Sequence, residues 1–371
     1  MVKDTPSVLH LASGDLWAGA EVQVFYLVRE LARTTSVRVQ VALLNDGELA
    51  RRLRGEGVGV TIFDESRLST FQILKQLVGL VRRAHVDVIH THRSKENLIG
   101  GVASRACNVI SLRTVHGSEE HNPSSLFSRR GLAMALDRFA GSHLQDAVVG
   151  VSQALSSDLR RKFGATRVAF VPNGIDIDLV RKAGLSTSPH SRPIRIGLVG
   201  RMVPVKRVDV FLMVAEELTR RDPERFKFML IGDGPLLAKL KESASNRGLV
   251  NVDFLGFRED SLRLIGELDI LMITSDHEGL PMVVLESLAL GVPVIAHAVG
   301  GLNEVITSSL QGRLVPSQNA QALADAVQCM AASLSDKSES LLPTRFDIVA
   351  TANEYTRLYD RLLARKPLNH S

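Results

Sequence analysis

The sequence of 371 residues predicts an α/β protein made of two domains, each with a doubly wound parallel sheet. Short apolar runs alternate with amphipathic stretches along the whole chain, which is typical of parallel strands covered by helices on both faces. The length fits two domains of roughly 150 residues each. A stretch rich in Ser, Pro and Gly at 184–193 interrupts the alternation and predicts a linker between the domains.

Before this linker, continuous apolar runs of strand length predict a first parallel sheet. The predicted strands are at 7–12, 37–43, 60–63, 86–91, 109–114, 147–151 and 168–171. Apolar residues at helical spacing lie between several of them and predict amphipathic helices at 20–33, 71–83 and 155–163. The first domain is therefore predicted to be Rossmann-like and to span 1–185.

After the linker the same alternation returns and predicts a second Rossmann-like domain at 190–346. Its strands are predicted at 194–199, 227–231, 252–255, 270–274, 293–296 and 312–315. A last helix at 348–363 carries apolar residues at helical spacing, within a terminal segment at 347–371. Two such domains in tandem place a ligand in an interdomain cleft, where the carboxyl ends of the strands face each other.

The charge of the chain favours an anionic partner. The formal net charge is +5 and the isoelectric point is near 9.3. The positive residues form clusters at Arg51-Arg52-Arg54, Arg82-Arg83, Arg129-Arg130 and Arg160-Arg161-Lys162. A membrane face would suit such a surface, although arginines on exposed helix faces are the simpler account. Because there is one Trp and only three Tyr for base stacking, we expect no nucleic-acid partner.

Cysteine usage and the chain ends indicate a cytoplasmic protein. Cys107 and Cys329 lie far apart and have no metal-ligand spacing, so no disulfide framework or zinc site is expected. The first six residues are polar and lead directly into a strand, which is not the pattern of a signal peptide. The weakly charged run at 279–302 is too broken by Pro, Gly, Glu and His for a transmembrane helix.

The segment 276–286 is the most informative part of the sequence. It places Glu278 and Glu286 eight positions apart, across a predicted loop that enters a helix. Pro281 suits the first helical position, because its missing N–H would have no partner there, and Gly291 suits the helix end. Glu286 interrupts an otherwise apolar helix, and a charge on such a face is rarely buried without a partner.

This segment has the outline of a nucleotide-sugar site. The free amides at Leu280, Met282 and Val283 would point outward at the positive end of the helix dipole, which favours a phosphate. Glu286 lies on the same helical face and could hold one hydroxylated ring, while Glu278 holds another. The alternative is an ordinary strand–loop–helix with two solvated glutamates.

One turn of interest follows the first strand of each domain. The turn in the first domain is made of small residues, and the turn in the second domain is basic. Gly19 and Ala20 open the helix after the first strand and would let a phosphate approach the backbone, although a plain turn is an alternative. In the second domain, Gly200 is followed by Arg201, which can chelate phosphate oxygens, and by Lys206, which adds a point charge. The GxxxxGK[ST] pattern of a P-loop is not present.

Two further turns of the second domain are predicted at the same rim. Asp233 lies in a tight loop at 232–235, and Phe257 follows another strand and could form a wall for a nucleobase. Both segments fit ordinary turns equally well. The Asp176-Ile177-Asp178 sequence superficially offers a metal-binding DxD, but its place after a Pro-Asn-Gly turn indicates turn and helix-cap chemistry.

Three histidines end two strands predicted in the first domain. His116 precedes Gly117 and is placed where an imidazole can hydrogen-bond a sugar or relay a proton. A satisfied structural histidine is the alternative. We expect His90 and His92 to lie on opposite faces. Because the three histidines lack a carboxylate or Cys companion at suitable spacing, no metal site is predicted.

Taken in order, these residues resemble the retaining glycosyltransferases of family 4 (glycosyl transferases group 1), which have the two-Rossmann-domain GT-B fold. The resemblance covers nearly the whole chain. It rests on the turn at 19–21, the His116-Gly117 pair, Val151-Ser152 with the motif at 172–176, Gly200-Arg201 with Lys206, and the Glu278…Glu286 signature with Gly279-Leu280-Pro281 between. One departure is Ala20, which replaces the second glycine of the usual turn.

The resemblance implies a role for each matching residue. Arg201 and Lys206 would bind the donor diphosphate and offset the charge on the departing nucleotide, so no divalent metal or other cofactor would be needed. Glu278 would contact hydroxyls of the transferred sugar, Glu286 the ribose hydroxyls, and the amides after Gly279 the sugar and phosphate. His116 would contact the sugar and the reacting centre, and Gly19 would approach the diphosphate.

The expected activity is transfer of a hexosyl-type group from a UDP-, GDP- or ADP-sugar to a hydroxyl of a saccharide or lipid-linked acceptor, in polysaccharide or glycolipid biosynthesis. The acceptor would enter over the first domain and the terminal helix would pack back on it. Peripheral contact with the inner face of a membrane would give the arginine clusters a use. A sugar-nucleotide 2-epimerase and a catalytically silent GT-B interaction module are the alternatives; a dinucleotide dehydrogenase ranks lower because G-x-G-x-x-G is not present.

Overall fold

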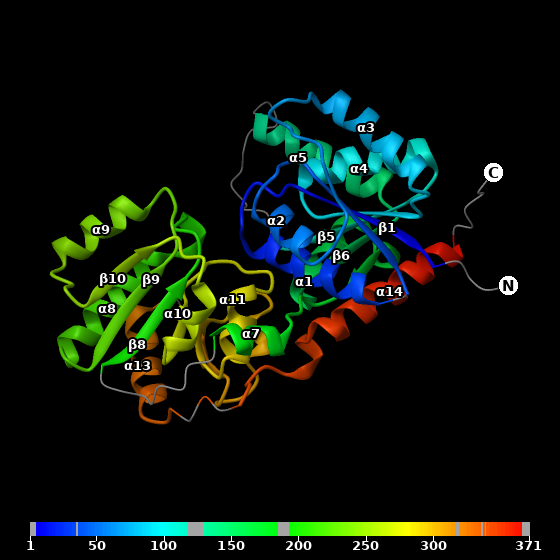
Figure 1. Cartoon of the computed structure of the whole chain (residues 1–371). Helices are drawn as coiled ribbons and strands as arrows, with labels where there is room; N and C mark the ends of the chain where they lie inside the picture. The colour runs from blue at the N-terminus through cyan, green and yellow to red at the C-terminus, as the bar shows by residue number, and fades with distance from the viewer. Residues whose placement is uncertain are drawn as a thin grey trace. The chain divides into compact units, whose positions relative to one another are not determined.

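A computed structural model of the chain describes residues 5–34, 36–117, 129–184, 193–316, 319–334, 337 and 339–365. The chain forms two compact units, seen in Figure 1. The first unit comprises Met1–Gly174 together with Ile348–Ser371, and the second comprises Ile175–Asp347. The chain therefore leaves the first unit and returns to it at its end.

The first unit is built on a parallel sheet, as the sequence predicts. Among the described residues its strand order is β3-β2-β1-β4-β5-β6-β7. The strands are β1 (Ser7–Ala12), β2 (Arg38–Leu43), β3 (Val60–Ile62), β4 (Val88–Thr91), β5 (Ile110–Val115), β6 (Ala147–Gly150) and β7 (Val168–Phe170). β1 pairs with both β2 and β4, so the order of strands reverses beside β1. Such a switch point is where open α/β sheets bind ligands.

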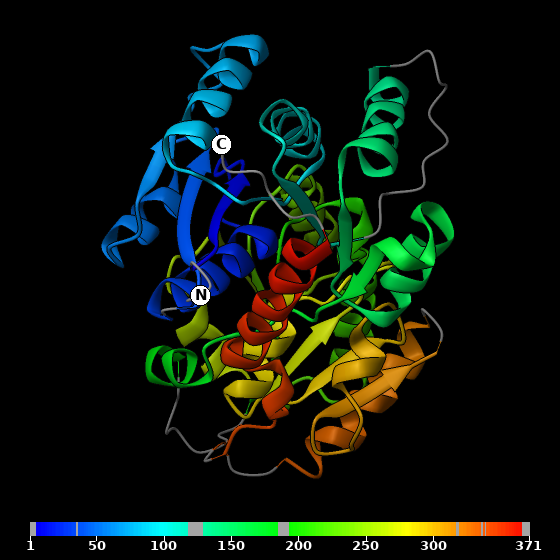
Figure 2. The ribbon, with the colours of Figure 1, turned by 90° about the vertical axis from the view of Figure 1, so that its right-hand side faces the viewer.

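Helices cover both faces of this sheet. They are α1 (Gly19–Arg33), α2 (Glu48–Gly55), α3 (Thr70–Arg83), α4 (Ser94–Cys107), α5 (Arg129–Phe139), α6 (Gln153–Phe163) and α14 (Ile348–Arg365), with short helical turns at Ala140–Leu144 and Ala165–Arg167. A capping box formed by Ser69 and Gln72 fixes the start of α3. The terminal helix α14, red in Figure 2, packs against α1.

The second unit repeats this architecture. Its described strands are ordered β10-β9-β8-β11-β12-β13, so its switch point lies between β8 and β11. The strands are β8 (Ile194–Val199), β9 (Phe226–Ile231), β10 (Val252–Gly256), β11 (Ile270–Ile273), β12 (Val294–His297) and β13 (Gly312–Val315). The helices are α7 (Ile177–Gly184), α8 (Val208–Arg221), α9 (Leu237–Asn246), α10 (Ser261–Glu267), α11 (Met282–Ala289), α12 (Leu302–Val305) and α13 (Ala320–Ala331), with short turns at Pro204–Lys206 and Thr344–Phe346.

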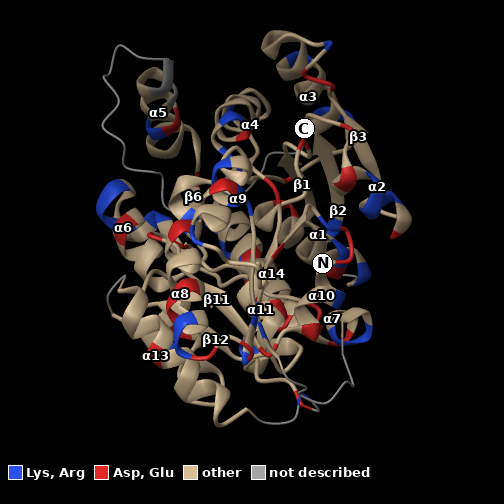
Figure 3. Ribbon diagram, turned by 90° about the vertical axis from the view of Figure 1, so that its left-hand side faces the viewer, with Lys and Arg blue, Asp and Glu red and all other residues tan. Residues whose placement is uncertain are grey.

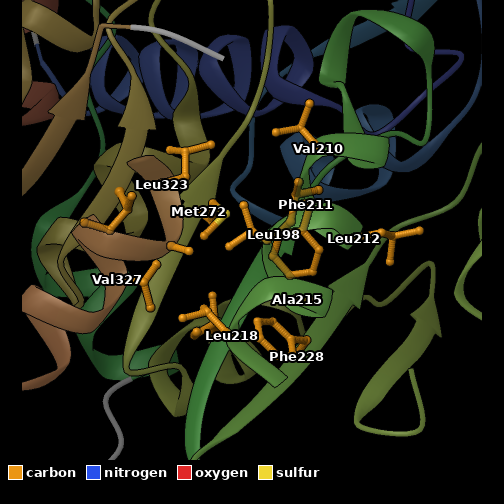
Figure 4. Close-up of a cluster of buried hydrophobic side chains, with 14 of the residues drawn as sticks. Leu198, Val210, Phe211, Leu212, Ala215, Leu218, Phe228, Met272, Leu323 and Val327 are labelled. Atoms are coloured by element: carbon orange, nitrogen blue, oxygen red, sulfur yellow. The ribbon is translucent and has the colours of Figure 1, made fainter. Parts of the chain in front are cut away.

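The core of the second unit lies between its sheet and helices α8 and α13. Figure 4 shows Phe211 of α8 against Phe228 of β9, with ring centroids 5.9 Å apart in an edge-to-face arrangement. Leu323 and Val327 of α13 are fully buried in the same cluster. This packing leaves the carboxyl ends of β8 and β11 free to carry polar loops.

The division between the units precedes the sequence boundary at 185. Helix α7 belongs to the second unit, because it packs against α10 and α11. The contact is close: a Cβ built on Gly184 would lie 2.4 Å from the carbonyl oxygen of Leu262. The predicted linker at 184–193 lies, apart from its two ends, outside the described residues.

Candidate functional site

Two loops of the second unit meet at its switch point and bring together a lysine and a glutamate predicted for the site. Lys206, after β8, donates from Nζ to Oε1 of Glu278, after β11, at 2.7 Å. The hydroxyl of Ser275 donates to the same carboxylate oxygen at 2.6 Å. The lysine backbone is fixed as well, because Thr274 donates to its carbonyl oxygen at 2.8 Å. Hydrogen bonds thus join the loop that carries Lys206 to the loop that carries Glu278.

Glycines let the loop after β8 lie close to the loop after β9. Gly232 has φ +136°, and a Cβ there would lie 2.0 Å from the carbonyl oxygen of Gly200. Gly234 has φ +157°, and a Cβ there would clash with Met202. The neighbouring Asp233 is exposed and accepts a turn hydrogen bond from the Gly234 amide, while Arg201 is exposed on the adjacent loop. These contacts set the shape of the rim beside Lys206.

Helix α11 begins one residue later than the sequence suggests. Pro281 is the N-cap, with extended backbone angles, and Met282 is the first helical residue. The proline is still compatible with this end of the helix, because no N–H is required of it. As the first two helical residues, Met282 and Val283 have amides with no acceptor inside the helix. Leu280 already has an interaction partner within the protein, so the free amides at this helix end are those of Met282 and Val283.

Glu286 lies one turn into α11, and its environment changes its acidity. Burial raises the pKa of its carboxyl group to about 7. Within the described part of the chain, no hydrogen bond or ion pair to this carboxyl group is found. Glu286 is half-buried, and a carboxyl group with a raised pKa and no partner in the protein is a candidate for a ligand-binding role.

A pair of glycines that sequence analysis did not single out supports the Glu278 loop. A Cβ built on Gly300, at φ +54°, would lie 1.8 Å from the carbonyl oxygen of Glu278. The amide of Gly301 donates to the carbonyl oxygen of Gly279 at 2.7 Å. Two consecutive glycines in the loop that follows a predicted strand are a signal that could have identified this contact.

The remaining residue predicted in this unit lies at its surface. Phe257, directly after β10, is 58% exposed. An exposed aromatic ring is available to stack against a planar ligand. The sites predicted at Gly200, Arg201, Lys206, Asp233, Phe257, 278–283 and Glu286 all belong to the second unit, whereas Gly19, Ala20 and His116 belong to the first.

The first unit has its own pocket near its switch point. Its volume is about 940 Å³, and Ala20, His92 and His116 are among its lining residues, together with the first turn of α4. Gly19 is the first residue of α1 and Ala20 the second. Next to them, the buried carboxylate of Glu21 pairs with Arg93 at 2.5 Å. Burial raises the pKa of Glu21, and the Arg93 charge opposes that rise.

The histidines of the first unit form a cluster, and the prediction that His90 and His92 face opposite ways is wrong. Residues two apart in a strand share a face, and these rings stack at 4.4 Å between centroids. His10, which sequence analysis missed, lies beside His90 in the sheet register. His90 also contacts the hydroxyls of Tyr359 and Thr114, each at 2.8 Å.

One ligand nitrogen from each of His10, His90 and His92 lies within 4.8 Å of the others. A metal site needs lone pairs that converge on one point. Here the ring planes of His90 and His92 stack within 28°, and ring nitrogens of His10 and His92 already contact each other at 3.1 Å. Hydrogen bonding accounts for the cluster, and the absence of a metal remains a prediction.

The arginine clusters lie on α2, α3 and α6 in Figure 3. Several of these cations have partners close by: Arg51 and Arg52 pair with Glu48, and Arg161 pairs with Asp158. Local pairing reduces the charge available to an anionic surface. The side chains of the cluster at 129–130 lie outside the described residues. None of the described helices is long and apolar enough to cross a bilayer.

Family models match both halves of the chain. Residues 17–179 match the model described as Glycosyltransferase Family 4, and residues 186–338 match Glycosyl transferases group 1. The 2-deoxystreptamine N-acetyl-D-glucosaminyltransferase of Streptomyces fradiae is 28% identical over 84% of this chain and 82% of its own length. An Escherichia coli enzyme named UDP-Gal:alpha-D-GlcNAc-diphosphoundecaprenol alpha-1,3-galactosyltransferase is 23% identical over 67% of each chain.

Solved structures agree on the fold. The Anabaena protein HepE, crystallised with UDP-glucose, has a TM-score of 0.78 at 21% identity and covers 96% of this chain and 99% of its own. The sucrose-phosphate synthase of Thermosynechococcus elongatus has a TM-score of 0.75 at 21% identity and covers 97% of this chain and 100% of its own. At these identities the similarity establishes the fold alone.

Proposed function

Because the chain belongs to the family 4 glycosyltransferases, enzymes of the GT-B fold, we propose that it moves a hexosyl-type sugar from a nucleotide diphosphate sugar to a hydroxyl of a saccharide or lipid-linked acceptor, with retention of configuration. The observation that carries this proposal is the Lys206–Glu278 pair at 2.7 Å beside the free amides of α11. A cation and helix amides suit a diphosphate, and a carboxylate suits sugar hydroxyls.

Each part of this loop pair has a proposed role. Lys206 and Arg201 bind the diphosphate and balance the charge that develops on the leaving nucleotide. Glu278, released from Lys206 when the donor enters, accepts hydrogen bonds from hydroxyls of the transferred sugar. The amides of Met282 and Val283 bind phosphate oxygens at the helix dipole. The two basic side chains take the place of a divalent metal, so no cofactor is proposed.

The rest of the donor is proposed to extend along the same rim. Glu286 accepts hydrogen bonds from the ribose hydroxyls, and Phe257 stacks on the base. Asp233 and its glycine neighbours shape the loop beside the phosphates. In the first unit, His116 contacts the transferred sugar, and the backbone at Gly19 and Ala20 approaches the diphosphate.

Relatives guide the choice of donor and setting. HepE was crystallised with UDP-glucose, and the E. coli relative is named for UDP-galactose, so we propose a UDP-hexose as the first donor to test, ahead of GDP- and ADP-sugars. That E. coli name also includes a lipid-linked acceptor, and polysaccharide assembly is the proposed setting. The protein is proposed to act in the cytoplasm, with peripheral contact at the inner face of a membrane.

A panel of UDP-, GDP- and ADP-sugars tests the proposal by thermal stabilisation. A true donor at 100 times its dissociation constant adds about 2.7 kcal/mol to the free energy of unfolding. Turnover with the stabilising donor and an acceptor should then give an α-linked product from an α-linked donor. If the donor alone is converted to its 2-epimer, the enzyme is an epimerase. If no sugar nucleotide raises the melting temperature, the chain is an interaction module.

Proton release on donor binding is expected from Glu286. Its pKa of about 7 in the free protein leaves it mostly protonated at pH 6. Ribose hydroxyls donate to the ionised carboxylate, so binding favours loss of the proton. The affinity for a UDP-sugar should therefore rise roughly tenfold from pH 6 to pH 8. Calorimetry in two buffers of different ionisation enthalpy measures the protons released.

The Glu286→Gln variant is the control for this measurement, because it removes the titrating group and keeps the shape of the side chain. Binding to the variant should release no proton and should depend little on pH. A UDP-sugar is used instead of UDP, because its diphosphate has no terminal phosphate that titrates near neutrality. Equal affinity of the wild-type protein at pH 6 and pH 8 would rule out this role for Glu286.

A further inference from the structure

Arg207, directly after Lys206, has a backbone conformation that arginine rarely adopts. Its φ is +47° and its ψ is +46°, in the left-handed region that favours glycine. In the described parts of the chain, the other non-glycine residues with positive φ are His85 and Asn108, which lie just past the ends of α3 and α4. The left-handed conformation is common at such helix ends. Arg207 instead precedes α8 as its N-cap, where an extended backbone is usual.

The side chain of Arg207 joins the two loops of the candidate site. Its Nη1 donates to Oδ1 of Asp276, in the loop after β11, at 3.2 Å. Its Nε and Nη2 donate to the carboxylate of Asp209, in the first turn of α8, at 3.1 and 3.0 Å. Asp276 is tied a second time, because its amide donates to the carbonyl oxygen of Val205 at 2.9 Å. The residues on either side of Lys206 therefore both hold Asp276.

We call the Arg207–Asp276 ion pair and the Val205–Asp276 hydrogen bond the loop clamp. The clamp includes neither the side chain of Lys206 nor that of Glu278. A bound donor is proposed to separate these two side chains, which removes a contact between the loops. Because the loop clamp does not use them, it can persist while both side chains turn to the donor. It then keeps the two loops in register.

The strain at Arg207 indicates a function beyond surface packing. A residue in a sparsely populated region of φ and ψ persists only where its surroundings fix it, and such residues cluster at functional sites. The side chains of Arg207 and Asp276 are 31% and 34% exposed. An ion pair with this exposure adds little to the free energy of unfolding. A glycine would adopt the same φ without strain, so stability alone does not account for an arginine here.

We propose that Arg207 is a positioning residue, which holds the loop of Glu278 against the loop of Lys206 through Asp276. In this role it acts on the donor only through the placement of those two loops. What Lys206 and Glu278 do to the donor rests on the proposed function, whereas the loop clamp itself does not depend on it.

The Arg207→Gly variant separates positioning from stability, because it removes the guanidinium and the backbone strain together. Its melting temperature should equal or exceed that of the wild-type protein. Its kcat should fall by roughly 10–100-fold, as expected when catalytic groups are misplaced, and the donor KM should change less than kcat. A wild-type kcat, or a fall in melting temperature that accompanies the loss of kcat, would overturn the proposal.

His85→Gly is the matched control for this variant. His85 has φ +46° and lies exposed in the first unit, so the substitution relieves the same backbone strain away from the two loops. Its melting temperature should also equal or exceed that of the wild-type protein, and its kcat should be unchanged. An equal loss of kcat in both variants would show that the loop clamp is not the cause.

Substitution of each acidic partner shows which contact of Arg207 matters. The Arg207→Gly/Asp276→Ala protein should lose no more kcat than Arg207→Gly alone, because both changes remove the same interaction. Asp209→Ala breaks only the contact within α8 and should leave kcat close to that of the wild-type protein. Additive losses in the double variant, or a large loss in Asp209→Ala, would contradict the role of Asp276.

Amide hydrogen exchange tests the loop clamp without any substrate. The amide of Asp276 donates to Val205, and its exchange in the free protein should be severalfold faster in Arg207→Gly than in the wild-type and His85→Gly proteins. Equal protection in all three proteins would overturn the loop clamp. If the wild-type protein transfers no sugar to any acceptor, the proposed function fails, and the exchange rates still decide whether Arg207 holds the two loops together.

Discussion

Replacing Lys206 with Ala is expected to lower kcat by roughly 10²–10³-fold, which is the usual effect of removing one group that stabilises charge in a transition state. The reason is that Lys206 is proposed to balance the charge on the departing nucleotide. In the free protein it pairs with Glu278 at 2.7 Å, and both side chains are partly exposed. Loss of the pair should therefore change stability little. Steady-state kinetics and thermal unfolding measure the two effects.

Lys239→Ala is the matched control for this experiment. Lys239 lies exposed on α9 of the same unit and far along the chain from the two loops, so its loss should change neither turnover nor melting. A Lys206→Ala enzyme with wild-type kcat would remove the lysine from the mechanism. A large drop in melting temperature together with kcat would instead assign Lys206 a structural role.

Replacing Gly300 with Ala is expected to destabilise the second unit and to abolish donor binding. A Cβ at this position would lie 1.8 Å from the carbonyl oxygen of Glu278, and the backbone φ is +54°. The clash is with backbone, which cannot move aside as a flexible side chain can, so the loop carrying Glu278 must shift. We expect a loss of about 2–4 kcal/mol in the free energy of unfolding. Denaturant unfolding and donor titration measure the effects.

Gly248→Ala is the control that separates the cost of backbone strain from the cost of a steric clash. Gly248 has φ +66°, and a Cβ there would meet no atom within 4 Å. The control therefore suffers only the left-handed backbone cost, about 1 kcal/mol, and should bind donor normally. If both variants lose the same stability and both still bind donor, the close approach of Gly300 to the Glu278 loop has no importance for the site.

The sequence was sufficient for the two parallel sheets and for the loops that follow β8 and β11. Apolar strand runs and helical periodicity are local signals, and the structure has strands and helices at the positions they predict. Lys206 and Glu278, 72 residues apart, were both predicted for the site, and their direct pairing is a finding of the structure. Resemblance to a known family supplied the roles that local patterns cannot give.

His10 and Gly300 were missed for a common reason. Their importance arises from contacts between segments whose relative register the sequence does not specify. His10 matters because β1 pairs with β4 so that it lies beside His90. Gly300 matters because its loop touches the backbone at Glu278. The start of α11 differed by one residue because a proline fits both the N-cap and the first helical position.

The return of α14 to the first unit has a consequence for synthesis on the ribosome. Residues of the second unit are contiguous in the chain, from Ile175 to Asp347, so this unit can fold as soon as it emerges. The first unit, although it is translated earlier, cannot complete its fold until α14 has been made. Its buried His90 and Thr114 obtain their hydroxyl partners from Tyr359 and Tyr355, which are made only after the whole second unit. Nascent chains of this protein are therefore expected to complete their halves in the reverse of the order in which they are translated.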